Sequence, residues 1–200
     1  IDMPDFTPPA DDGITVNCPD EALVPPATPT VFDHCGNPVT PTLVSSPSAV
    51  ECEGPMEWIY NYTDCAGNSH DWTYTYTIQY LPFPAIAPTS DITDCYDNIV
   101  LPAPPVVTDN CGVELTPTGP IESTIPECEG DITYTWTYTD CAGNSQEYVH
   151  TVTIDMPDFT PPADDGITVN CPDEALVPPA TPTVFDHCGN PVTPTLVSSP

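Results

Sequence analysis

Hydrophobic and polar residues alternate strictly along two stretches that follow proline-rich parts of the chain. In residues 58–64 three aromatic side chains, Trp58, Tyr60 and Tyr62, lie at every second position, and in residues 72–78 aromatic residues alternate with threonine. A period of two that combines aromatic and β-branched residues is typical of a half-buried β-strand. The intervening segment reads Cys-Ala-Gly-Asn-Ser. The sequence therefore predicts a β-hairpin in which Gly67 supplies the positive φ of the turn and Asp64 accepts hydrogen bonds from turn amides.

The same design recurs in residues 133–139, where tyrosine and tryptophan on one face oppose threonine on the other. Gly143 and Asp140 take the corresponding turn positions. Shorter strands are predicted before the first hairpin, at residues 14–17, 29–33 and 39–45. No segment shows a helical period, because proline recurs every few residues in the first half of each unit.

About seven short strands with turn signals between them favour a two-sheet sandwich. The expected fold class is all-β, with tandem immunoglobulin-like β-sandwich domains that are stapled by disulfides and arranged as a rod or filament. Proline fits strand edges and bulges, where it hinders pairing between molecules. The prolines in such positions are Pro25, Pro26, Pro29 and Pro41.

The chain is built from repeats at two levels, and these fix its organisation. Residues 154–200 repeat residues 1–47 letter for letter, and residues 138–145 match residues 62–69. Phe6, Phe83 and Phe159 mark equivalent junctions. The predicted division is the end of a preceding repeat at 1–6, a first repeat at 7–82, a second at 83–158, and the first half of another at 159–200.

The charge balance excludes several classes of partner. The chain has no lysine or arginine, 30 aspartates and glutamates, and a formal charge of −30. Such a chain cannot neutralise phosphates, so neither nucleic acid nor an anionic membrane surface is an expected partner. No apolar run reaches the length of a membrane span, so no membrane insertion is expected in this segment. The acidity favours a soluble, self-repelling surface.

The ten cysteines recur at regular positions and indicate disulfides formed in an oxidising, extracellular setting. A zinc site is not favoured, because no Cys-x-x-Cys pair is present. In an antiparallel sandwich, consecutive loops lie at opposite poles, so cysteines can be sorted by pole. This sorting predicts four bonds, each within one repeat and worth about 3–4 kcal/mol. They are Cys18–Cys52, Cys35–Cys65, Cys95–Cys128 and Cys111–Cys141.

Four short motifs in a fixed order resemble a known family. They are Cys-Pro at Cys18 and Cys171, Asp-x-Cys-Gly, Cys-Glu-Gly, and Thr-Asp-Cys-Ala-Gly-Asn. This order resembles the hyalin-repeat (HYR-like) domains, in particular the four-cysteine type of giant surface proteins of Bacteroidota. The second repeat departs from it with Cys95-Tyr96. The resemblance implies adhesin stalks and cell-surface filaments, often exported by type IX secretion and sometimes linked to gliding motility.

An enzyme is not expected. The histidines are His34, His70, His150 and His187. His187 copies His34, and His150 takes the strand position of Tyr74, where a surface strand residue is expected. The chain has neither a cationic clamp for an oxyanion nor a Gly-x-Ser-x-Gly elbow.

Calcium is the one candidate cofactor, because it takes six to eight oxygen ligands and two junctions are rich in carboxylates. The candidate ligands are Asp2, Asp5, Asp11, Asp12, Asp155, Asp158, Asp164 and Asp165. The alternative is that these aspartates are solvated turn residues. Asn61 begins a glycosylation sequon, with a solvent-facing strand residue as its alternative interpretation.

The function that the sequence favours is the stalk region of an extracellular, cell-surface fibre or adhesin. The prolines after Phe6 and Phe159 limit slack between repeats and predict a semi-rigid rod. Expected partners are neighbouring repeats of the same chain and possible other copies in a filament. The alternative function is a module that binds carbohydrate or a surface directly, which predicts aromatic clusters in loops; alternating threonines leave ice binding as a further alternative.

Overall fold

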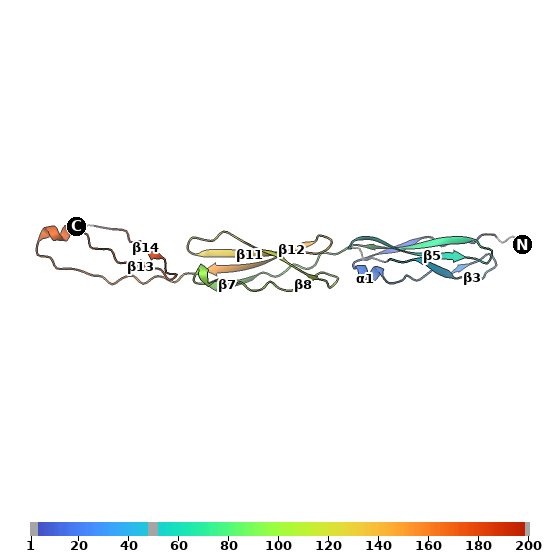
Figure 1. Ribbon diagram of the computed structural model, residues 1–200, viewed down its shortest axis with the longest axis horizontal. Helices are drawn as coiled ribbons and strands as arrows, with labels where there is room; N and C mark the ends of the chain where they lie inside the picture. The colour runs from blue at the N-terminus through green and yellow to red at the C-terminus, as the bar shows by residue number, and fades with distance from the viewer. Residues whose placement is uncertain (1–3, 48–51, 199–200) are drawn as a thin grey trace. The chain divides into compact units, whose positions relative to one another are not determined.

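The computed structural model describes residues 4–47 and 52–198 and has an all-β architecture of disulfide-stabilised, immunoglobulin-like repeats (Figure 1). The first repeat contains β1 (Asp12–Val16), α1 (Pro19–Ala22), β2 (Val31–Phe32), β3 (Pro38–Val39), β4 (Pro41–Ser45), β5 (Gly54–Thr63) and β6 (Ser69–Ile78). The second contains β7 (Thr89–Thr93), η1 (Tyr96–Asn98), β8 (Val107–Thr108), β9 (Glu114–Leu115), β10 (Thr118–Glu122), β11 (Gly130–Thr139) and β12 (Ser145–Ile154). The remainder contains η2 (Pro172–Leu176), β13 (Val184–Phe185) and β14 (Pro191–Val192).

The two complete repeats share one topology. The first has a four-stranded sheet in the order β1-β6-β5-β4, and the second has the order β10-β11-β12-β7. In each, the first strand runs parallel to the last, as β1 does to β6 and β7 does to β12. The small sheets β2-β3, β8-β9 and β13-β14 are antiparallel pairs.

The predicted hairpins are confirmed. β5 and β6 pair without a register shift from Gly54↔Ile78 to Thr63↔Ser69. Gly67 has a φ of 91° and Gly143 one of 89°, so both adopt the left-handed conformation that the turn requires. The period of two was a reliable signal here because each hairpin buries one continuous aromatic face.

The elements before the hairpin differ in detail from the prediction. The predicted strand at 39–45 is two strands, because Thr40 separates β3 from β4. The prediction that no helix is present is wrong for one turn, because α1 begins at Pro19. The Cys18 backbone N–H donates to Glu21 Oε1 at 3.0 Å. Proline is favourable in the first turn of a helix, where its missing N–H is not needed. A four-residue helix is also too short to produce a hydrophobic period.

Two hydrophobic clusters fill the first repeat. One gathers Phe6, Val31, Val39, Tyr62 and Trp72. The other gathers Ala22, Met56, Trp58, Tyr76, Ile78 and Tyr80. Phe6 therefore packs into the core of the first repeat. The long β5–β6 hairpin contributes to both clusters and is the structural centre of the repeat.

Aromatic side chains also satisfy the backbone of the proline-rich segment. The Tyr62 hydroxyl donates to the Pro29 carbonyl at 2.8 Å, and the Tyr76 hydroxyl donates to the Val24 carbonyl at 3.0 Å. A segment rich in proline has few N–H groups for a sheet, while its buried carbonyls still require donors. The tyrosines of the hairpin supply those donors and fix the extended segment over the core.

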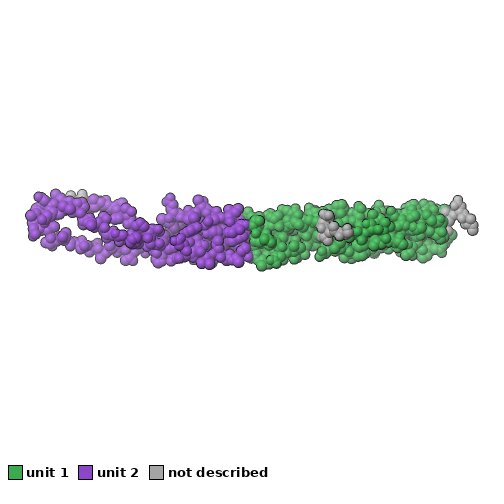
Figure 2. Space-filling model, viewed as in Figure 1, with its two compact units in different colours: residues 1–86, 105–118, 137–147 green, residues 87–104, 119–136, 148–200 purple. Residues whose placement is uncertain are grey.

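The compact units of the molecule differ from the sequence repeats (Figure 2). Unit 1 comprises residues 1–86, 105–118 and 137–147, and unit 2 comprises residues 87–104, 119–136 and 148–200. Two loop-bearing segments of the second repeat thus belong to the unit that contains the first. Among the described residues, no helix is long and apolar enough to cross a membrane.

Candidate functional site

Five loops in the described chain are built on the same aspartate frame. In the first, Asp33 Oδ1 accepts hydrogen bonds from the backbone N–H groups of Cys35 at 2.9 Å and Asn37 at 2.8 Å. Asp33 Oδ2 accepts a third from the Asn37 side chain at 2.9 Å. The hydrogen bonds from the side chain and backbone of Asn37 hold the pKa of Asp33 below its ordinary value. The frame recurs at Asp64, Asp109, Asp140 and Asp186, which confirms the predicted turn role of Asp64 and Asp140.

Each aspartate frame carries a cysteine, and three such loops form disulfides with cysteines of the adjacent sequence repeat. Cys18 is bonded to Cys111, Cys52 to Cys141 and Cys95 to Cys188, with Cα–Cα distances of 5.5, 5.9 and 5.7 Å. These distances lie within the usual span of a disulfide, roughly 4.4–6.8 Å. Within a repeat, the first cysteine bonds to the second of the next repeat, and the third bonds to the fourth of the next.

The predicted bonds within one repeat are therefore wrong. Cys18–Cys52, Cys95–Cys128 and Cys111–Cys141 are excluded by the observed partners, and Cys35 and Cys65 are both unpaired. Cys18 and Cys52 do both lie beside loops of the second repeat, as their sorting to one pole implied. The error was to bond the two cysteines of a pole to each other, when each faces a separate loop of the following repeat. Among the described cysteines, Cys35, Cys65, Cys128 and Cys171 are free and exposed.

The loops of the second repeat also cover the core of the first. Cys111 and Ala142 pack against the cluster that contains Tyr80. The Asn110 side chain donates hydrogen bonds to the carbonyls of Leu81 at 2.9 Å and Pro82 at 2.7 Å. The contact between the two repeats thus combines two disulfides, apolar burial and recognition of the linker backbone.

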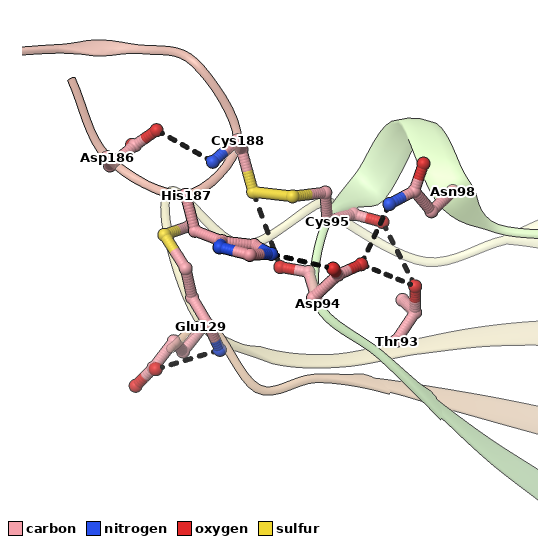
Figure 3. A network of polar contacts seen from close by, with 9 residues as sticks. Thr93, Asp94, Cys95, Asn98, Glu129, Asp186, His187 and Cys188 are labelled. Atoms are coloured by element: carbon pink, nitrogen blue, oxygen red, sulfur yellow. Dashed lines mark hydrogen bonds and ion pairs between the residues drawn. A yellow bond between two sulfur atoms is a disulfide. The ribbon is translucent and has the colours of Figure 1, made fainter. Parts of the chain in front are cut away.

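The contact around Cys95 has a different polar residue at the corresponding position (Figure 3). His187 precedes Cys188, and its Nε2 lies 3.0 Å from Asp94 Oδ2. The Asn98 side chain donates to Asp94 Oδ1 at 2.7 Å. The hydrogen bond from Asn98 and that from His187 lower the pKa of Asp94. Sequence reasoning missed this pair, although the signal was present: Asp94 replaces Asn17 before the first cysteine, and His187 replaces Asn110 before the second.

Two further histidines, His70 and His150, occupy structural positions. His70 Nε2 lies 2.8 Å from Asp5 Oδ2, and its ring meets Phe6 edge-on at 5.1 Å between centroids. The expectation that His150 is a surface residue is wrong, because it is 1% exposed. Its Nδ1 lies 2.8 Å from Thr89 Oγ1.

The candidate calcium ligands do not converge in the described chain. Asp5 is engaged with His70, Asp11 Oδ1 accepts the Thr73 backbone N–H at 2.8 Å, and Asp165 Oδ1 accepts the Gly166 N–H at 2.7 Å. Asp12 Oδ1 accepts the Gly13 N–H. Asp155, Asp158 and Asp164 belong to no group of three or more metal-ligating side chains among the described residues, and Asp2 lies outside those residues. Calcium binding stays a prediction, which calorimetric titration with and without a chelator would test.

The Asn61 side chain faces its neighbours on the sheet. Its Nδ2 donates to Asp71 Oδ1 at 2.6 Å, and its Oδ1 accepts from Thr63 Oγ1 at 2.7 Å. Glycosylation of Asn61 would therefore require the amide nitrogen to leave Asp71. The modification also stays a prediction.

Comparison with known proteins agrees with the repeat structure. Comparison with curated proteins gave no match. The sequence profile of the HYR-like domain with 4 cysteines matches three times, at residues 6–78, 83–154 and 159–200. These matches cover nearly the whole chain and begin at the three junction phenylalanines. The chain therefore belongs to the family of HYR-like domains with four cysteines, which are non-catalytic, extracellular repeats of the adhesion type.

Proposed function

We propose that this chain is part of the stalk of an extracellular bacterial surface fibre or adhesin that extends from the cell for adhesion or gliding. The observation that carries the proposal is that every described disulfide joins one sequence repeat to the next. Disulfides within a domain are the usual way in which a small secreted domain is stabilised. Bonds between consecutive repeats instead reinforce the connections along the chain.

The mechanical consequence supports a load-bearing role. Tension between the first and second repeats passes through the linker around Phe83 and also through Cys18–Cys111 and Cys52–Cys141. The linker cannot lengthen while these covalent bonds hold. The chain has no lysine, so disulfides take the place of isopeptide cross-links, and the proline-rich junctions contribute a semi-rigid connection.

The resemblance to surface proteins of Bacteroidota supports export by type IX secretion and a link to gliding. The acidic surface supports the same role, because like charges without any cationic side chain keep neighbouring stalks apart. The alternative of direct carbohydrate binding is less supported. The aromatic residues that such a site would need are largely buried in the hairpins, as for Trp58, Tyr62 and Trp72.

Immunogold microscopy of source cells tests the proposal. Antibodies raised against this chain are expected to label surface fibres at regular intervals along their length, and deletion of the coding region is expected to shorten those fibres. Label confined to fibre tips would contradict a stalk. Binding of the purified chain to glycan-coated surfaces would support the alternative.

A further inference from the structure

A cavity of about 200 Å³ lies beside the free thiol of Cys128. Its lining includes Cys95, Ile154, Met156 and Cys188. Cys95 and Cys188 are bonded to each other, so the cavity adjoins a contact at which the following repeat has already begun to dock.

The equivalent place in the first repeat is filled. Cys52 corresponds to Cys128 and is bonded to Cys141, while Ala142 packs on the cluster that contains Tyr80. The rims of the two places match closely. Glu53 Oε1 accepts the Tyr80 N–H at 3.2 Å, and Glu129 Oε1 accepts the Met156 N–H at 3.1 Å. Tyr80 is 7% exposed beneath its cover, whereas Met156 is only partly buried.

We propose that the cavity beside Cys128 is a docking site for an Asp-Cys-Ala-Gly-Asn loop, of the kind seen at residues 64–68, and that Cys128 forms a disulfide with the cysteine of that loop. The occupant is the continuation of the repeat that begins at Phe159. Residues 159–200 copy residues 6–47, and in the first repeat the next aspartate-framed cysteine loop after residue 47 is the one at 64–68. This inference rests on the proposed function, since it extends the same chain of linked repeats.

The loop at residues 64–68 has the structure that the site requires. Asp64 Oδ1 accepts the backbone N–H groups of Ala66 and Asn68, each at 2.9 Å. This frame leaves Cys65 exposed and unpaired. The corresponding loop at Asp140 has the same hydrogen bonds and is bonded through Cys141 to the first repeat. The loop is thus formed before docking and loses little conformational freedom when it binds.

Bond formation requires a two-electron oxidant, and a small-molecule disulfide such as oxidised glutathione supplies it. The Cys128 thiolate attacks that disulfide, which forms a mixed disulfide and releases one small thiolate. The thiolate of the incoming loop then attacks the Cys128 sulfur and releases the second. The two protein thiols lose two protons and two electrons, and the oxidant becomes two thiols.

The same rule assigns the remaining free cysteines. Cys35 and Cys65 are the second and fourth cysteines of their repeat, so each takes a bond from the preceding repeat. Cys171 is a first cysteine and bonds to the second cysteine of the next repeat. His34 precedes Cys35 as His187 precedes Cys188, so the partner of Cys35 is a first cysteine that follows an aspartate, as Cys95 follows Asp94.

The decisive experiment completes the third repeat. A second copy of residues 48–82 is appended after Pro200, and Cys65→Ser in the first repeat removes the identical competing peptide. After refolding in a glutathione redox buffer, mapping of peptides under non-reducing conditions is expected to find Cys128 linked to the cysteine of the appended copy. Alkylation of Cys128, which is expected to be complete in the 200-residue chain, is expected to be lost.

In a matched control, the cysteine of the appended copy that corresponds to Cys65 is also changed to serine. Cys128 is expected to remain open to alkylation in this control. Peroxide oxidation of Met156 is expected to be slower in the extended chain than in the 200-residue chain, because the docked loop covers it. A Cys128–Cys141 bond, or an alkylated Cys128 in the extended chain, would overturn the proposal. Covalent multimers linked through Cys128 would overturn the assignment to the same polypeptide.

Protein isolated from source cells gives a second test that does not depend on refolding. Peptides that contain Cys65 and Cys128 are expected to be linked to each other there. Fibres that are labelled along their length but carry a free Cys128 would reject this docking site and leave the proposed stalk intact. An intact Cys65–Cys128 link in protein from cells that carry no labelled fibres would support the docking site and reject the proposed stalk.

Discussion

At the scale of single residues, the loop aspartates determine how each cysteine is presented. Asp140 is 5% exposed and accepts backbone hydrogen bonds from Ala142 at 3.0 Å and Asn144 at 2.9 Å. The Asn144 side chain donates a third at 2.9 Å. The geometry of Cys141 therefore depends on a carboxylate that is its direct neighbour in the chain.

Asp140→Ala is expected to remove these acceptors and leave partly buried N–H groups of Ala142 and Asn144 without partners. The expected loss is about 2–3 kcal/mol of unfolding free energy, measured by urea unfolding under oxidising conditions. Asp97→Ala, at an exposed carboxylate in η1, is the matched control and is expected to change stability little. Equal losses in both variants would show that the frame has no special role.

The lowered pKa values of three frame aspartates, Asp33, Asp64 and Asp186, predict how acid affects the fold. The pKa is lowered for Asp33 mainly by Asn37 and for Asp186 mainly by the backbone of Asn190. For Asp64, burial opposes the shift, but hydrogen bonds from Asn68 and Ala66 overcome it. A carboxyl whose folded-state pKa is depressed contributes stability above its unfolded pKa, and this stability is lost as the pH falls through the folded value.

Unfolding free energy is therefore expected to stay level from neutral pH to about pH 4 and to fall below the ordinary aspartate pKa of about 3.9. Urea unfolding at a series of pH values between about 7 and 2 measures this directly. A stability that rises as the pH falls below 4 would mean that relief of acidic self-repulsion outweighs the aspartate frames.

At the scale of elements, the sequence predicted the long hairpins well because turn chemistry and a strand period of two coincide there. It predicted the exposure of His150 wrongly, although the alternation of residues along β12 indicates which face His150 lies on. Tyr148, Val152 and Ile154 share its parity on β12 and are all buried. His150 therefore faces the core, where Thr89 of the parallel strand β7 lies beside it. A neighbour that comes from a strand far away in sequence has no local signal.

The prediction of the disulfide pairing failed for a related reason. Loop order correctly sorts cysteines to poles, but a pole of one repeat meets the opposite pole of the next, and sequence spacing within one repeat does not distinguish the two choices. The alternation of Asn17 with Asp94, and of Asn110 with His187, did encode a contact between repeats. This alternation indicates a contact between repeats only once His187 is known to lie beside Asp94.

The hairpin tyrosines predict an alkaline limit to stability. Burial, together with the hydrogen bond to Glu122, raises the pKa of Tyr134 to about 12. Burial also raises the pKa of Tyr62, Tyr76 and Tyr80. A group with a raised pKa contributes stability that is complete below its unfolded pKa of about 10 and is lost as the pH rises through the folded value.

An ultraviolet titration of phenolate absorbance is expected to show delayed ionisation of these tyrosines, and urea unfolding is expected to show declining stability between about pH 10 and 12. Tyr134→Phe is expected to remove the component that ionises near pH 12. Ionisation of every tyrosine near pH 10 in the folded chain would contradict this account.

At the scale of the whole molecule, overlapping disulfide loops predict that the chain stays covalently joined after a single cut. The segment between Cys52 and Cys111 lies inside two loops, those closed by Cys18–Cys111 and Cys52–Cys141. A specific protease site inserted between Ala87 and Pro88 lies in this segment. After cleavage, the two pieces are expected to migrate together without reductant and to separate with it. Separation without reductant in the parent chain would contradict the observed pairing.

The control for this cleavage combines Cys18→Ser with Cys52→Ser, which removes both bridges across the cut. Its two pieces are expected to separate under either condition. Variants with only one of the two changes are expected to stay joined, because the remaining bridge is sufficient.

The forward direction of each bond also has a consequence in time. Cys18 lies 93 residues before its partner, and Cys95 lies 93 residues before its own. At a synthesis rate of about 5–20 residues per second, the partner is made roughly 5–20 s later. The first and third cysteines of a new repeat therefore wait as thiols until the next repeat appears. Because the bonds form in an oxidising setting, a chain that is exported while it is still being made is expected to be oxidised in the order of synthesis, with an open end at its newest repeat.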